Sequence, residues 1–197
     1  MLKNLIFHGQ IPYFSTLKKI LRFLPLIALI IFIKPEFYRD FGVLGWWILL
    51  FVVLIRPLSD ILPKLGILKT LTILRKELGI ISGIFILAHG IGFLLKKDLP
   101  VIVSLFSPKF WNFQSFFGWG SLGLFLAIIL LLTSNKWAIK SLKKYWKPVQ
   151  RLVYLLVLAT AIHIGLVNSE EKISSAIIVA ILVLVWLLAN RKIKLWK

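Results

Sequence analysis

Residues 147–168, KPVQRLVYLLVLATAIHIGLVN, decide the fold class of this chain. The stretch opens with Pro148 at a position that suits the first turn of a helix, and it is predominantly apolar over the roughly 20 residues that a bilayer span requires. It carries one histidine, His163, near its far end. Because an ionisable group inside a membrane span is costly, such a residue indicates a functional site.

The composition of the whole chain is that of an integral membrane protein. Hydrophobic residues make up 59% of the 197 residues, and the mean hydropathy is +0.92. The net charge of +18 does not indicate a nucleic-acid partner, because the basic residues stand at the ends of apolar runs rather than on one soluble face. The chain has no cysteine, which excludes disulfides and thiolate-bound metal centres.

Six apolar runs predict an all-α bundle of six transmembrane helices. The predicted spans are residues 18–33, 41–55, 78–95, 113–132, 149–167 and 173–189, so residues 1–197 form one transmembrane domain with no soluble domain left over. The second span is expected to end at Arg56-Pro57, where charge and proline coincide. Residues 61–77, in which basic and apolar side chains alternate, predict a short helix in the membrane interface.

The distribution of basic residues predicts the orientation. Of the 25 Lys and Arg residues, 19 fall in the N-terminus, the second and fourth loops and the C-terminus, and 6 fall in the other three loops. Positive charge favours the cytoplasmic side, so both termini are expected in the cytoplasm. The chain is therefore predicted to be a multi-pass protein of the inner, cytoplasmic membrane.

The third span carries a second histidine, His89, at nearly the same depth as His163. His89 precedes Lys96 by seven residues and His163 precedes Asn168 by five, which places both roughly 8 to 10 Å from the outer boundary. Two imidazoles without a nearby carboxylate or thiol suit the axial positions of a haem iron better than a zinc site, which needs further ligands. The alternative is that each histidine hydrogen-bonds a neighbouring helix. The third histidine, His8, lies in the polar N-terminal segment and is expected to be an ordinary solvated or interfacial residue.

Residues 118–123, GWGSLG, match the dinucleotide-binding pattern G-x-G-x-x-G letter for letter. A dinucleotide site needs a preceding strand, a tight turn and a soluble crevice, whereas these residues open an apolar span. We interpret the glycines as a surface for close helix packing.

Four further segments carry a family resemblance. They are IRPLSD at 55–60, LRKELGIISGIFILAHGIGF at 74–93, LLTSNKW at 131–137 and YWKPVQRLVYLLVLATAIHIGLV at 145–167. In this order they resemble the ferric-reductase-like transmembrane family, and within it the bacterial haem-binding membrane subunits of periplasmic methionine sulfoxide reductase systems.

The resemblance implies one b-type haem per chain, held by His89 and His163. Those subunits have a further histidine at the start of the fifth span, where this chain has Gln150. The residues 14 positions before the two histidines, where relatives with two haems place ligands, are Arg75 and Val149. FMN, which is reported in the family, has no motif here, although an inner basic cluster would suit its phosphate: Arg75, Lys76, Lys143, Lys144 and Arg151.

The predicted function is that of an electron-transfer subunit rather than a complete enzyme, because no soluble domain remains to bind a nicotinamide or a flavin. The resemblance implies electrons from the quinone pool or a cytoplasmic flavin reductase. It implies delivery to a soluble outer-face reductase, such as a molybdenum-containing methionine sulfoxide reductase. The alternatives are a ferric-iron-reducing relative and a haem-free transporter or scaffold protein.

Overall fold

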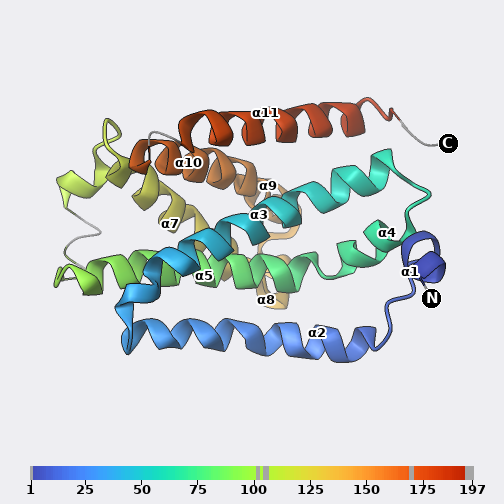
Figure 1. Cartoon of the computed structure of the whole chain (residues 1–197), viewed down its shortest axis with the longest axis horizontal. Coiled ribbons are helices and arrows are strands. Elements are labelled where there is room, and N and C mark those ends of the chain that lie inside the picture. Colours follow the sequence, from blue (N-terminus) through green and yellow to red (C-terminus); the bar gives the residue numbers. More distant parts are fainter. Residues whose placement is uncertain (1, 101–102, 104–106, 169–170, 194–197) are drawn as a thin grey trace.

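A computed structural model describes residues 2–100, 103, 107–168 and 171–193. Every regular element in these residues is helical, as predicted (Figure 1). The α-helices and the 3-10 helices, marked η, are α1 Leu2–His8, α2 Phe14–Phe23, η1 Leu24–Phe32, η2 Pro35–Phe37, α3 Tyr38–Ile61, α4 Gly66–Ile73, α5 Arg75–Lys96, η3 Pro108–Trp111, α7 Phe116–Leu132, α8 Lys136–Leu142, η4 Lys143–Tyr145, α9 Trp146–Gln150, α10 Leu152–Val167 and α11 Glu171–Asn190.

Two helix pairs form the centre of the bundle. Helix α5 packs along α3, α10 packs along α7, and the two pairs meet where α5 contacts α7. Figure 1 shows α11 on one side of this centre and α2 with η1 on the other. Helix α1 and the end of α11 lie at one end of the bundle, and the starts of α3 and α7 lie at the opposite end.

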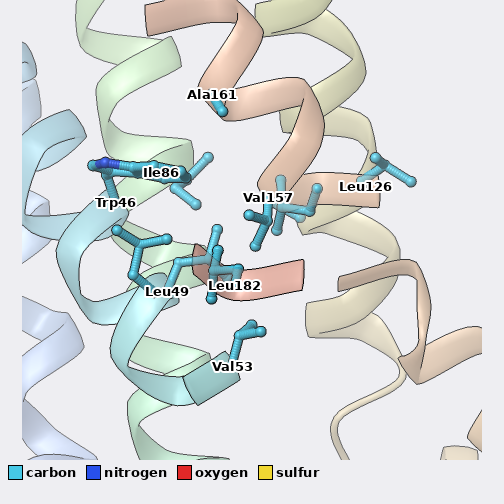
Figure 2. Close-up of a cluster of buried hydrophobic side chains, with 11 residues drawn as sticks. Trp46, Leu49, Val53, Ile86, Leu126, Val157, Ala161 and Leu182 are labelled. Atoms are coloured by element: carbon cyan, nitrogen blue, oxygen red, sulfur yellow. The ribbon is translucent and has the colours of Figure 1, made fainter. Parts of the chain in front are cut away.

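Two clusters of buried apolar side chains hold the helices together. The larger one lies where α3, α5, α7, α10 and α11 meet (Figure 2), and comprises Trp46, Leu49, Leu50, Val53, Ile86, Leu126, Ala127, Leu156, Val157, Ala161 and Leu182. The smaller one lies between η1, α3 and α5, and comprises Ala28, Ile31, Phe41, Ile81, Phe85 and Ala88. Close packing of such side chains is the main attraction between helices in a lipid environment.

The described helices account for part of the predicted span pattern. Three are long and apolar enough to cross a membrane: Pro35–Ile61, Arg75–Lys96 and Ile173–Asn190. Phe116–Leu132 with Lys136–Gln150 forms a fourth if the pair, bent by 92°, is counted as one span, and Leu152–Val167 is a shorter apolar helix. The first predicted span corresponds to α2 and η1, which begin at Phe14. Six spans and cytoplasmic termini stay predictions.

The predicted end of the second span is wrong. Helix α3 continues through Pro57 to Ile61. A proline removes one helical hydrogen bond and crowds the preceding turn. Here the last turn is stabilised by other contacts: Arg56 Nε lies 3.1 Å from Asp60 Oδ2, and Ile61 is buried. The burial of Ile61 is the larger of these contributions, because the Arg56–Asp60 pair is exposed.

Residues 61–77 contain the predicted short helix, α4, and also the first turn of α5. Helix α4 packs against α1, where Thr70 Oγ1 donates a hydrogen bond of 2.9 Å to the carbonyl oxygen of Gly9. Its position in a membrane interface stays a prediction.

Candidate functional site

Two histidines from different helix pairs meet at the end of the bundle where α3 and α7 begin. His89 lies in α5 and His163 lies in α10, each near the last turns of its helix. Their ring centres are 6.1 Å apart, and their ring planes are inclined at 79°. The structure thus brings together the two histidines that the sequence placed at one depth. Their role as iron ligands stays a prediction.

A backbone carbonyl lies behind each imidazole. Nδ1 of His89 is 2.8 Å from the carbonyl oxygen of Tyr38, and Nδ1 of His163 is 2.8 Å from that of Phe116. A carbonyl oxygen only accepts, so Nδ1 must carry the proton in each ring and donate it. Nε2 then keeps its lone pair, and neither Nε2 has a hydrogen-bond partner among the described residues. Each histidine therefore has one nitrogen fixed and one free to bind a metal.

A glycine beside each imidazole leaves room for its hydrogen bond to the backbone carbonyl of Tyr38 or Phe116. A Cβ atom on Gly42 would lie 2.6 Å from Nδ1 of His89, and a Cβ atom on Gly120 would lie 2.9 Å from Nδ1 of His163. Both separations are shorter than real Cβ contacts. Any larger residue at either position would push the imidazole away from its hydrogen bond.

The rings of the two residues whose carbonyls accept these hydrogen bonds also lie against the histidines. The Tyr38 ring centre lies 5.6 Å from that of His89, and the Phe116 ring centre lies 5.9 Å from that of His163. Aromatic contacts of this kind limit the rotation of the imidazoles and keep water from them.

The separation of the imidazoles fits a single metal between them. Two imidazoles bound through Nε2 on opposite sides of one metal have ring centres about 6 Å apart, since each metal–nitrogen bond is about 2 Å and each ring centre lies about 1 Å behind its nitrogen. Within the described part of the chain, no group of three His, Cys, Asp or Glu side chains could hold a metal ion. The ring-centre distance of 6.1 Å is the one that a haem iron held between the two histidines would need, and their role as its ligands stays a prediction.

Sequence reasoning missed the residues that hold the histidines. Tyr38 and Phe116 act through backbone carbonyls, which have no signature in residue type, and Gly42 and Gly120 act by having no side chain. The available signal was a pattern of aromatic, glycine and leucine positions that occurs twice, in YRDFGVLG at 38–45 and in FFGWGSLG at 116–123.

The segment GWGSLG has a packing role in the structure. Gly118 lies against the backbone of Asn112, and Gly120 lies against His163. Both contacts agree with the interpretation of these glycines as a surface for close approach.

His8 lies far from the other two histidines. It is the last residue of α1, at the opposite end of the bundle (Figure 1), and its side chain is exposed.

Residues 36–161 match the family described as ferric reductase like transmembrane component. The matched segment is more than half of the chain, includes His89 and ends two residues before His163. The chain belongs to the ferric-reductase-like transmembrane family. It is accordingly a multi-pass membrane protein.

Three relatives have the name protein-methionine-sulfoxide reductase haem-binding subunit MsrQ. The Agrobacterium fabrum protein is 30% identical over 136 residues, which cover 67% of this chain and 60% of the relative. The Rhizobium meliloti protein is 27% identical over 160 residues, which cover 78% of this chain and 70% of the relative. The Brucella ovis protein is 30% identical over 154 residues, which cover 75% of this chain and 66% of the relative. The matched part of this chain thus spans 60% to 70% of their lengths. No solved structure matches the chain.

Gln150, which stands where the resemblance implies a further histidine, lies in a polar contact between helices. Its Nε2 donates a hydrogen bond of 2.8 Å to Oγ1 of Thr133, the residue after α7. Nε1 of Trp146 donates to the carbonyl oxygen of Thr133 at 2.9 Å. This position therefore joins α9 to the end of α7.

Two residues of the inner basic cluster have other partners in the structure. Nε of Arg75 donates to the carbonyl oxygen of Val52 at 3.1 Å, and Nζ of Lys144 lies 5.2 Å from the ring centre of Tyr145. Neither contact indicates a phosphate site, and no sequence motif for FMN binding is present.

Proposed function

We propose that this chain is a b-type haem subunit that transfers electrons in the membrane, with His89 and His163 as the axial ligands of one haem. The observation that carries the proposal is the pair of free Nε2 atoms on imidazoles whose Nδ1 atoms are fixed and whose ring centres lie 6.1 Å apart. The printed name of the relatives, haem-binding subunit, supports the same cofactor.

The partners form part of the proposal, because the chain matches only 60% to 70% of the relatives' lengths. The relatives' name supports a methionine sulfoxide reductase as electron acceptor, here a soluble molybdenum-containing enzyme at the outer face. The histidines lie at the end of the bundle away from most of the basic residues, which is the outer end if the positive end is cytoplasmic. Quinol or a cytoplasmic flavin reductase would supply electrons.

Aromatic contacts support an exit for electrons at the histidine end. The Phe116 ring lies against His163, and its centre is 4.1 Å from the centre of the Phe117 ring. The ring centres of Phe117 and Phe110 are 5.0 Å apart. Phe110 belongs to η3, in the connection between α5 and α7. These rings form a continuous series of contacts from the histidine pair to the loop that an outer partner would meet.

The protein's own contribution is to hold, orient and shield the cofactor. A bound haem supplies an iron that accepts and releases one electron at a time. His89 and His163 would hold that iron from both sides, while their Nδ1–H donors keep the imidazoles in one tautomer. The apolar and aromatic side chains around them exclude water from the site.

The haem-free alternative explains less of the geometry. A scaffold or transporter could use the Nδ1 hydrogen bonds to link helices. It would give no role to the two Nε2 atoms, which have no hydrogen-bond partner among the described residues. A ferric-iron-reducing relative would share the haem site and differ in its acceptor.

The purified protein is expected to contain one haem per chain. An optical spectrum in detergent, combined with a pyridine haemochrome assay and a protein determination, measures the ratio. A Soret band with a ratio near one supports the proposal. A folded protein that stays colourless after expression with added haem precursor supports the haem-free alternative, and a ratio near two would reveal a second ligand pair.

Both ends of the chain are expected in the cytoplasm, because 19 of the 25 basic residues lie on that side of the predicted topology. Green fluorescent protein fused after residue 197 should fluoresce, and alkaline phosphatase fused at the same place should be inactive. The reverse pattern would place the histidine pair near the cytoplasm and exclude a direct contact with an outer reductase.

A further inference from the structure

An eight-residue pattern occurs at the start of both helices that contact the histidines. YRDFGVLG begins α3 and FFGWGSLG begins α7, so each has an aromatic residue at its first and fourth positions, glycine at its fifth and eighth, and leucine at its seventh. The first residue of each copy supplies the carbonyl that meets a histidine, and the fifth residue is the glycine beside that histidine.

Helix geometry explains why these two positions work together. The Cα–Cβ bond in a helix tilts toward the N-terminus, so a side chain covers the turn that precedes it. A side chain at the fifth position would therefore lie over the carbonyl of the first. Glycine leaves that oxygen uncovered, and its second lone pair can accept from an imidazole while the first accepts the helical N–H.

We infer that the two copies are equivalent clamps, each of which holds one histidine as the Nδ1–H tautomer and so presents Nε2 to the cofactor. In this arrangement Gly42 and Gly120 are positioning residues. This inference rests on the proposed function for the identity of the ligands, and it adds the reason why the two ligands come from two helix pairs built in the same way.

The two clamps differ in how tightly they fit. The added Cβ would be 2.6 Å from Nδ1 at Gly42 and 2.9 Å at Gly120. One turn further on, the copies diverge: an added Cβ at Gly45 would be 3.1 Å from Cγ1 of Ile86, whereas at Gly123 the nearest side-chain atoms are at 3.8 Å. Gly123→Ala is therefore a matched control for Gly120→Ala in the same helix.

Gly42→Ala and Gly120→Ala are expected to weaken haem binding by roughly 10- to 100-fold, the range seen when a metal-binding histidine loses its hydrogen-bond partner. Gly42→Ala should have the larger effect. Gly123→Ala should stay within about twofold of the parent protein, since it does not touch the Nδ1 contact. Haem titration of the purified apoprotein, followed by absorbance, measures these affinities.

The tautomers can be read without haem and without any change at the glycines. Nitrogen NMR of the haem-free protein with 15N-labelled histidine should show two residues locked with the proton on Nδ1, assigned with His89→Ala and His163→Ala. An Nε2–H tautomer at either residue would overturn the clamp, as would Gly42→Ala and Gly120→Ala variants that bind haem like Gly123→Ala. If haem binding instead survives removal of His89 or His163, the proposed ligands are wrong, and the NMR result decides the clamp separately.

Discussion

Replacing either His89 or His163 with alanine is expected to abolish the low-spin haem spectrum. Each substitution leaves the iron with one imidazole and creates a cavity beside a carbonyl that has lost its donor, that of Tyr38 or of Phe116. The loss of affinity should exceed the roughly 10- to 100-fold expected for losing only a ligand's hydrogen-bond partner. Absorbance spectra of the purified variants, at equal protein concentration, measure the effect.

His8→Ala is the control, because His8 is exposed at the opposite end of the bundle. It should have a normal spectrum and normal haem content. If His8→Ala lost the haem while His163→Ala kept a bis-histidine spectrum, the paired histidines would not be the ligands.

Removing the two cations beside Glu77 is expected to destabilise the fold by roughly 2 kcal/mol. Glu77 is 7% exposed, and its Oε1 lies 3.6 Å from Lys18 Nζ and 3.7 Å from Arg22 Nε. Isolating a buried charge costs about 3–5 kcal/mol. We expect less than this range, about 2 kcal/mol, because the cations are 31% and 63% exposed and water screens part of their attraction to Glu77. Thermal unfolding of Lys18→Gln/Arg22→Gln in detergent, monitored by circular dichroism, measures the loss.

Two further variants separate this effect from net charge. Lys3→Gln/Lys19→Gln removes the same charge from residues that form no ion pair with the described part of the chain, and it should unfold like the parent protein. Adding Glu77→Gln to the Lys18→Gln/Arg22→Gln variant should restore much of the lost stability, because no buried charge then remains. Equal destabilisation by both double variants would show that Glu77 does not depend on its cations.

Hydrophobic patterning was sufficient to predict a helical membrane protein and to bring His89 and His163 together. Depth along two parallel spans is a simple function of residue number, so the pair could be found without a structure. Helix ends were harder to predict. Helix α3 passes Pro57 and ends at Ile61, and the burial of Ile61 depends on the folded chain.

The supports of the site could not be predicted from residue type. The acceptors for the two histidines are the backbone carbonyls of Tyr38 and Phe116, and any residue has such a group. In the sequence, Gly120 belongs to a dinucleotide-like pattern, whereas Gly42 belongs to no known motif. The repeated eight-residue pattern acquires a meaning once the structure places each copy beside a histidine.

Electron paramagnetic resonance of the oxidised, purified protein tests the central claim most directly. Iron held on both sides by imidazole nitrogens is predicted to show a low-spin ferric signal that accounts for one spin per chain and is lost in His89→Ala and in His163→Ala. A high-spin ferric signal from the parent protein, which indicates iron with fewer than two strong axial ligands, would contradict the account.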